Sequence, residues 1–204
     1  FDEDGSGQLS LSASDVDDAE LDFSVTGGSS IVASLSGGDV TFSAPANFNG
    51  SESFTASVTD GEYTDSQSFS VTVNAVNDVP VAATGLSGSG EEDQSISVLL
   101  SGSDIDGDVL SYSISGQTSN GTVEISGSNA VYTPNDNYSG SDSFTFVVSD
   151  GELQDSATVS LTVNAVNDAP VLASVSDVSF DEDGSGQLSL SASDVDDAEL
   201  DFSV

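Results

Sequence analysis

The stretch SESFTASVTDGE at residues 51–62 returns as SDSFTFVVSDGE at residues 141–152, a step of 90. In both copies, apolar side chains alternate with Ser and Thr before a D-G-E segment. Alternation with a period of two is typical of a half-buried β-strand. Asp-Gly marks a turn, since Gly adopts the backbone angles that a tight turn requires. The stretch therefore predicts a strand and a turn within a repeated unit.

The repeat extends to both sides of this stretch. VNDVP at residues 76–80 returns as VNDAP at residues 166–170, again a step of 90. Residues 1–25 and 180–204 are the same sequence, FDEDGSGQLSLSASDVDDAELDFSV, which gives a longer period of 179. Similarity at a fixed period is typical of repeat arrays. The chain is therefore a series of modules of roughly 90 residues that alternate in two versions.

The same alternation recurs along the whole chain, and no stretch has convincing helical spacing. Its apolar positions are Leu9, Leu11 and Ala13; Leu21, Phe23 and Val25; Phe54, Ala56 and Val58; Phe69, Val71 and Val73; Ile96, Val98 and Leu100; Leu110, Tyr112 and Ile114; Phe144, Phe146 and Val148; and Val159, Leu161 and Val163. Shorter strands are predicted over 31–35, 40–42, 122–125 and 130–132. Some seven short strands in a module of this size indicate an antiparallel β-sandwich of immunoglobulin size.

The predicted fold class is thus all-β: tandem seven-strand antiparallel Greek-key β-sandwiches in a linear array. We predict a sandwich that lacks its opening strand at residues 1–78 and a second sandwich at residues 79–168. Residues 169–204 are predicted to be the N-terminal part of a third repeat.

Charge limits the partners. The chain has 36 acidic residues and no Lys, Arg or His, so its formal net charge is −36. Nucleic-acid binding depends on Lys and Arg that neutralise phosphates, so a nucleic-acid partner is excluded, and an anionic membrane surface is excluded on the same ground. No apolar run is long enough to cross a membrane, so direct membrane insertion is not expected.

Composition also limits the chemistry. Without Cys or His the chain has no thiolate or imidazole ligand for zinc. Carboxylate, amide, hydroxyl and carbonyl oxygens remain, and these are ligands of hard cations, calcium above all. The absence of His and Lys removes the usual general base and Schiff-base chemistry. We therefore expect a calcium-binding chain that is not an enzyme.

The ordered motifs carry a family resemblance over the whole chain. They are DED or EED near a module's start, then S-D-x-D, L-x-[FY]-S-[VI], N-[FY]-x-G-S-x-S-F and V-[TS]-D-G-E, and finally V-N-D-x-P. In this order they resemble the cadherin-like (Ig-like β-sandwich) tandem repeats of large bacterial extracellular adhesins, and more distantly the cadherins themselves. In cadherins, acidic groups converge on the joint between consecutive domains, where calcium bridges them.

The resemblance implies a set of calcium ligands at three joints. The first joint would take Asn77 (through its carbonyl), Asp78, Asp104, Asp106 and Asp150, with Glu3 from the far end of its own module. The second would take Glu92, Asn167, Asp168, Asp194 and Asp196, and an upstream joint would take Asp15, Asp17 and Asp60; Glu182 repeats Glu3. Ala75 and Ala165 replace the first linker Asp of animal cadherins, so we expect only one or two ions per joint.

Other interpretations of the Asp-rich segments are weaker. Any single Asp-rich turn also forms as a solvated turn without a metal. The segment Asp104-Ile-Asp106-Gly107-Asp108 looks like the start of an EF-hand loop, but its twelfth position is Ser115 and no helix is predicted beside it. We therefore reject an EF-hand.

The expected function is mechanical. We predict the extender or stalk of a calcium-dependent bacterial surface adhesin, extracellular, whose partners are neighbouring repeats of the same chain, with the adhesive ligand bound elsewhere in the parent protein. One alternative is the repeat subunit of an extracellular filament or surface-layer polymer, in which identical chains form a fibre by strand donation. A third is an array of carbohydrate-binding modules, which the inward positions of most Phe and Tyr residues disfavour.

Overall fold

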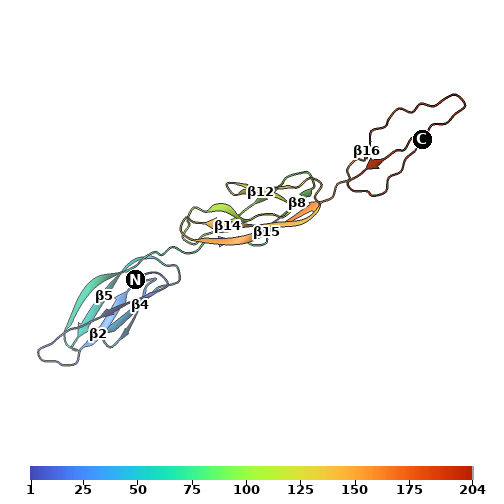
Figure 1. The fold of residues 1–204 in the computed structure, drawn as a ribbon. Helices are drawn as coiled ribbons and strands as arrows, with labels where there is room; N and C mark the ends of the chain where they lie inside the picture. The colour runs from blue at the N-terminus through green and yellow to red at the C-terminus, as the bar shows by residue number, and fades with distance from the viewer. Residues whose placement is uncertain (204) are drawn as a thin grey trace. The chain divides into compact units, whose positions relative to one another are not determined.

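The computed structural model of the chain describes residues 1–203. They divide into two compact units, Phe1–Asp78 (unit 1) and the remainder from Val79 onward (unit 2). Strands and turns make up both units, as Figure 1 shows. The described residues contain no helix, and therefore none long and apolar enough to cross a membrane.

Unit 1 is a sandwich of two three-stranded antiparallel sheets. One sheet has the order β1-β4-β3 and the other β2-β5-β6. The strands are β1 (Ser6–Ser10), β2 (Asp22–Gly27), β3 (Val32–Ser36), β4 (Asp39–Ser43), β5 (Gly50–Thr59) and β6 (Thr64–Val73).

Unit 2 contains the second sandwich and the third repeat. The sandwich pairs a three-stranded sheet, β12-β13-β9, with a four-stranded sheet, β11-β14-β15-β8, and adds the short pair β10-β7; the third repeat holds the pair β16-β17. The strands are β7 (Val81–Ala82), β8 (Ser87–Glu91), β9 (Ile96–Leu99), β10 (Gly102–Ser103), β11 (Ser111–Gly116), β12 (Gly121–Ser126), β13 (Asn129–Pro134), β14 (Gly140–Ser149), β15 (Gln154–Asn164), β16 (Val171–Leu172) and β17 (Ala192–Ser193).

Most of the alternating apolar positions lie in the cores, although Leu9 and Ala13 are exposed. The sheets confirm the predicted all-β sandwich class. In unit 2 the inward residues of β14 and β15 are almost completely buried and pack on Tyr132 and Ile96. In unit 1 the core is smaller and centres on Phe42 and Phe54, whose rings meet edge to face with centroids 5.3 Å apart. Polar outward positions leave the other face of each sheet solvated, as expected for antiparallel sheets.

One strand pairing departs from the prediction. β8 runs parallel to β15, with Ser87 opposite Ser160 and Glu91 opposite Asn164, whereas we predicted only antiparallel pairs. The sequence of β8, SGSGE, has no apolar alternation, so the rule that found the other strands could not find this one. Its glycines lie where a side chain would collide: a Cβ at Gly88 would be 2.6 Å from Val98 Cγ2.

Identical sequence takes different structures in the first and third repeats. Residues 6–10 and 22–27 form β1 and β2 in unit 1, paired with β4 and β5. In the third repeat, residues 185–189 and 201–203 form no strand. Figure 1 shows only the short β16 arrow labelled in this segment.

The predicted module boundaries remain predictions. Unit 1 ends at Asp78, and the described residues of unit 1 contain no strand that corresponds to β7 or β8. Only Phe1 and Asp2 occupy part of that position, because Asp2 forms an isolated parallel bridge with Asn74.

We expect Phe146→Ala to destabilise the second sandwich by about 3–5 kcal/mol, because the fully buried ring leaves a cavity that its neighbours fill only partly. Hydrogen exchange of the β14 and β15 amides measures this loss separately from unit 1. Tyr63→Ala, at an exposed ring in unit 1, is the control and leaves the exchange rates of unit 2 unchanged. Equal exchange rates in β14 for both variants would contradict the assignment of Phe146 to the core.

Candidate metal centre

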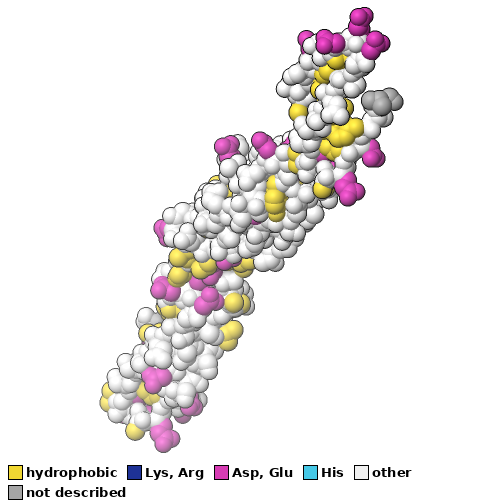
Figure 2. All heavy atoms as spheres, turned by 45° about the vertical axis from the view of Figure 1, so that its right-hand side comes forward, with side chains coloured by type: hydrophobic (Ala, Val, Ile, Leu, Met, Phe, Trp, Pro, Cys, Tyr) yellow, Lys and Arg dark blue, Asp and Glu magenta, His cyan; other side chains and the backbone are white. Residues whose placement is uncertain are grey.

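Carboxylates in this chain have no basic side chain to pair with. Figure 2 shows Asp and Glu side chains over the visible surface and no Lys, Arg or His. Carboxylates that are partly or fully withdrawn from water therefore accept hydrogen bonds from backbone N–H groups. The carboxylates fall into two classes. In the satisfied class both oxygens accept hydrogen bonds, and in the other class one oxygen accepts none.

Glu52 and Asp142 belong to the satisfied class. Glu52, on β5, accepts hydrogen bonds from the N–H groups of Ser29, Ser30 and Ile31 and from Ser29 Oγ. The hydroxyl and N–H of Ser29 and the other two N–H groups lower the pKa of Glu52 to about 2. These bonds hold the 29–31 loop against the sheet.

Asp142 has the same position in unit 2. It accepts hydrogen bonds from the N–H groups of Ser119 and Asn120 and from the hydroxyl of Tyr132. Burial raises the pKa of Asp142, but the hydrogen bonds to its carboxylate outweigh burial and leave the pKa lowered. Both residues are structural.

Glu3 and Glu92 lie at the start of their modules and reach the end of the last strand. Both are more than nine-tenths buried, with exposed fractions of 7% and 5%. Glu92 Oε1 accepts a hydrogen bond of 2.6 Å from the N–H of Val166, and Glu3 Oε1 accepts the corresponding bond of 2.5 Å from Val76. Glu3 Oε2 is buried and accepts no hydrogen bond. These glutamates thus fix the V-N-D segment that follows each sandwich.

Asp168 of the second V-N-D segment lies among four other carboxylates. Burial raises its pKa, and the negative charges of Asp196, Asp93, Glu92 and Asp194 raise it further. Its N–H donates a 2.6 Å hydrogen bond to Asp196 Oδ2, which ties the linker to the S-D-x-D segment of the third repeat. Asp168 Oδ2 is buried and has no hydrogen-bond donor.

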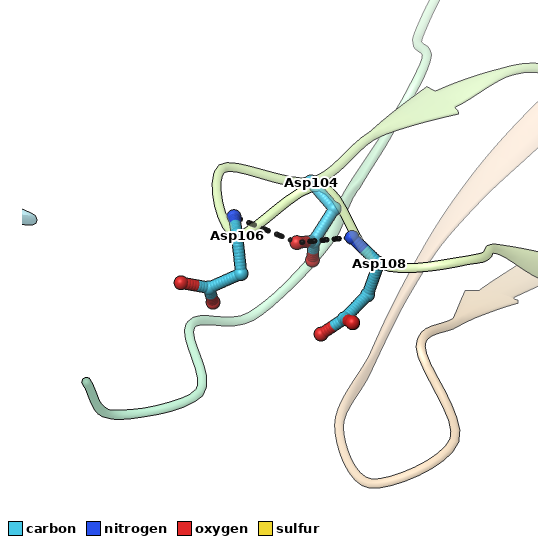
Figure 3. Close-up of side chains that lie close together, drawn as sticks. All are labelled: Asp104, Asp106 and Asp108. Carbon is cyan, nitrogen blue, oxygen red and sulfur yellow. Dashed lines mark hydrogen bonds between the residues drawn. The ribbon is translucent and has the colours of Figure 1, made fainter.

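The S-D-x-D segments are tight loops that turn several carboxylates to one side. Asp194 Oδ1 accepts hydrogen bonds of 2.9 Å from the N–H groups of Asp196 and Asp197. Asp104 Oδ1 likewise accepts from Asp106, Gly107 and Asp108, and Figure 3 shows Asp106 and Asp108 on either side of it.

The donor atoms of both segments suit a hard cation. Ligand oxygens of Asp104, Asp106 and Asp108 lie within 4.8 Å of one another, and Asp104 Oδ2 is buried without a hydrogen bond. At the second V-N-D segment, burial and the negative charges of the neighbouring carboxylates raise the pKa of Asp168. A divalent cation would relieve this repulsion and would supply the missing partner of Asp168 Oδ2. Carboxylate-only sites of this kind fit calcium.

The other candidate ligands differ in their hydrogen bonds and exposure. Asp15 and Asp60 close their own turns: Asp15 accepts from the N–H of Asp17, and Asp60 accepts from Glu62 and Tyr63, bonds that lower its pKa. Asp150 repeats the turn of Asp60 in unit 2. The Asn167 side chain donates to the carbonyl of Asp168, and Glu182 is exposed.

Asn77 and Asp78 end unit 1, whereas Asp104, Asp106 and Asp150 belong to unit 2. Their convergence at one joint stays a prediction.

Two acidic residues near these clusters were missed by sequence reasoning. Asp93 contributes to the raised pKa of Asp168, and Asp108 completes the cluster with Asp104. Asp93 has a left-handed backbone with φ of 58°, as do Asp4 and Asp183 at the same place in the other repeats. The recurrence of Asp at this position was the available signal. Asp108 was visible only as part of the rejected EF-hand pattern.

Comparison with known families decides the classification. The model of the bacterial Ig domain matches residues 1–73 and 77–162, which is more than half of the chain. The chain belongs to the bacterial Ig domain family. Bacterial Ig domains are typically structural modules and are commonly extracellular. The predicted Ig-like and cadherin-like repeats are thus confirmed. No curated protein matches the chain in sequence.

Solved structures give similar but distant matches. Two domains of human protocadherin-24 are 19% identical, with 76% of this chain and 86% of that chain covered and a TM-score of 0.48. Three titin I-band domains are 14% identical, with 82% and 61% covered and a TM-score of 0.35. An endo-fucoidan hydrolase of glycoside hydrolase family 107 is 23% identical with a TM-score of 0.34; the match covers 79% of this chain but only 26% of the hydrolase.

We expect Glu52 to titrate at about pH 2, and the amide protons of Ser30 and Ile31 to follow it in NMR spectra. Because the pKa is lowered by folding, the stability that Glu52 contributes is present above about pH 4.5 and is lost as the pH falls toward 2. Glu52→Gln removes both the titration and this part of the acid sensitivity of unit 1. Glu62→Gln, at an exposed turn, preserves both. A midpoint near 4.5 in the wild type would show that these hydrogen bonds do not form.

Proposed function

We propose that this bacterial Ig chain is part of the extender of a bacterial surface adhesin and that calcium stiffens it at its junctions. The observation that carries the proposal is the environment of Asp168, a partly buried carboxylate with one orphaned oxygen and four neighbouring carboxylates. Without a cation these charges repel one another, and the chain has no basic residue that offsets them. A cation bound between these carboxylates would neutralise the repulsion and link the segments that carry them.

At the second junction we assign the ion to Asp168, Asp194 and Asp196, with Glu92 and Asp93 beside it. Asp168 belongs to the linker, whereas Asp194 and Asp196 belong to the third repeat. An ion held by all three therefore restricts the linker against the third repeat. The same residue types recur at 76–78 and 103–106.

A stalk function follows from the repeat design. Bacterial Ig domains are commonly extracellular modules, and the module here is repeated, with residues 1–25 recurring unchanged at residues 180–204. Repetition of one module supplies length, whereas a binding or catalytic role requires a distinct surface. Millimolar calcium outside cells would occupy sites of the affinity found in extracellular modules, about 10⁻⁴–10⁻³ M.

We expect the full chain to bind calcium more tightly than magnesium in isothermal titration calorimetry at constant ionic strength. Asp168→Asn weakens this binding by about tenfold or more, because it removes a charged ligand. Glu124→Gln, an exposed carboxylate of β12, leaves the affinity unchanged. Equal stabilisation by calcium and by sodium chloride would mean that the carboxylates are only screened, and the metal assignment would fail.

The same variant has the opposite effect without calcium. Because burial and the neighbouring carboxylates raise the pKa of Asp168, its charge is unfavourable in EDTA, and Asp168→Asn then increases hydrogen-exchange protection of residues 166–196. In calcium, Asp168→Asn instead decreases the hydrogen-exchange protection of these residues. A general folding defect would decrease protection in both conditions.

We expect calcium to narrow the distribution of distances between two spin labels in unit 2. The chain has no Cys, so Ser156→Cys on β15 and Ser189→Cys in the third repeat accept labels at two exposed positions. Pulsed EPR then compares the distributions in calcium and in EDTA. The narrowing disappears in Asp168→Asn and persists in Glu124→Gln. A distribution that calcium leaves broad would contradict the stiffening, even if the ion binds.

A further inference from the structure

Strand β3 is an outer edge of its sheet. It pairs with β4 on one side, and no other described strand pairs with its second side. Unit 2 has the same arrangement, because β12 is the corresponding edge of the sheet β12-β13-β9. The sandwich of unit 2 also contains β7 and β8, so the open edge is a property of both modules. An unpaired strand edge exposes backbone N–H and C=O groups on which another chain can pair.

The two edges differ in charge. Residues 23–38, which include β3, contain no Asp or Glu, although the chain has 36 acidic residues. Natural edge strands are commonly protected against pairing by a charged side chain. β12 has such a side chain, the exposed Glu124 in the middle of the strand, whereas Ser34 takes this position in β3. β12 is therefore protected by charge, and β3 is not.

The hairpin of β3 and β4 decides which backbone groups face the open edge. The two-residue turn 37–38 has a φ of 62° at its first glycine, and Ser36 pairs with Asp39 beside the turn. In such a hairpin the closing pair is hydrogen-bonded, and hydrogen-bonded and non-hydrogen-bonded pairs alternate along the ladder. Ala33 and Leu35 thus belong to non-hydrogen-bonded pairs, and their N–H and C=O groups point away from β4.

We propose that β3 pairs with β3 of a second copy of the chain, antiparallel and centred on Ser34. Ala33 of each strand then lies opposite Leu35 of the other, and each pair exchanges both of its backbone hydrogen bonds. Ser34 faces Ser34 as a non-hydrogen-bonded pair, and Val32, which is 60% exposed, gains contact with Ser36. The contact has two-fold symmetry, so it closes as a dimer. In the proposed stalk it would hold two chains together through their sheets.

Charge favours a second copy over a partner of another kind. A basic partner would be attracted to the carboxylates elsewhere on the chain and not to a strand without charge. Two copies of this acidic chain repel each other over most of their surfaces, so they approach closely only where both lack charge. β3 meets this condition. Two copies of β12 would instead place Glu124 directly opposite Glu124, which is destabilising.

Disulfide cross-linking tests the partner and the register together, because the chain has no Cys of its own. In the proposed pairing, Ser34→Cys brings two Cα atoms to about 4.5 Å, within the range of a disulfide. Ser36→Cys is the control, also exposed and on the same face of β3. It lies opposite Val32 of the other copy, so its two Cα atoms are about 14 Å apart, too far for a disulfide.

The net charge of the two chains opposes association, so the measurement requires screening. In EDTA and about 1 M sodium chloride the Debye length is about 3 Å, which removes calcium and most of the long-range repulsion. In a glutathione redox buffer under these conditions, we expect Ser34→Cys to form linked dimers of the full chain about tenfold faster than Ser36→Cys or more.

Charge substitution tests the same contact without a thiol. Ser34→Glu weakens self-association in sedimentation equilibrium by about fivefold, because like charges directly opposite each other on paired strands are destabilising. The fold tolerates this change, since Glu124 has the same position in β12. Gln67→Glu, at an exposed position of β6, adds the same charge away from β3 and leaves the association unchanged.

Three results would each overturn the proposal: equal cross-linking of the two Cys variants, a chain that is monomeric at every concentration, or equal association of the Ser34→Glu and Gln67→Glu chains. Calcium is absent throughout, so these outcomes are independent of the metal site.

Discussion

The hydrogen bond from a backbone N–H to a carboxylate is the interaction on which this fold depends. A chain with 36 acidic and no basic side chains can form no side-chain salt bridge, and each withdrawn carboxylate must find another donor. Glu52 and Asp142 use loop amides, and Glu92 uses the amide of Val166. Where the amides satisfy both oxygens, the carboxylate locks a loop. Where one oxygen remains, as in Asp168, the fold has a position that a cation completes.

The strands with strict alternation were predictable because burial on one face leaves a direct trace in sequence. Alternation alone was enough to place Phe144, Phe146 and Val148 in the core. β8 was not predictable, because its glycines are dictated by the side chain of Ile96 on a different strand.

The candidate site was predictable in part for a similar reason. The S-D-x-D and V-N-D motifs identified Asp168, Asp194 and Asp196 as candidate ligands, because the residue types and the spacing of a motif are local properties of the sequence. Asp93 could not be found in this way, since its role comes from its proximity to a residue 75 positions later, as 168 minus 93 shows. Asp60 and Asp150 have equally acidic neighbourhoods in sequence, yet both accept amides of their own turns. Acidic composition alone does not separate a turn from a ligand.

The parallel pairing of β8 with β15 has a mechanical consequence. In sequence, β8 lies near the beginning and β15 near the end of the second sandwich, so tension along the chain would pull them in opposite directions along their common axis. The ladder from Ser87 opposite Ser160 to Glu91 opposite Asn164 is then loaded in shear, with all its hydrogen bonds strained together. An antiparallel pair at the same place would open like a zipper, one bond after another. In a chain loaded as the proposed stalk, β8 would thus act as a force-bearing clamp.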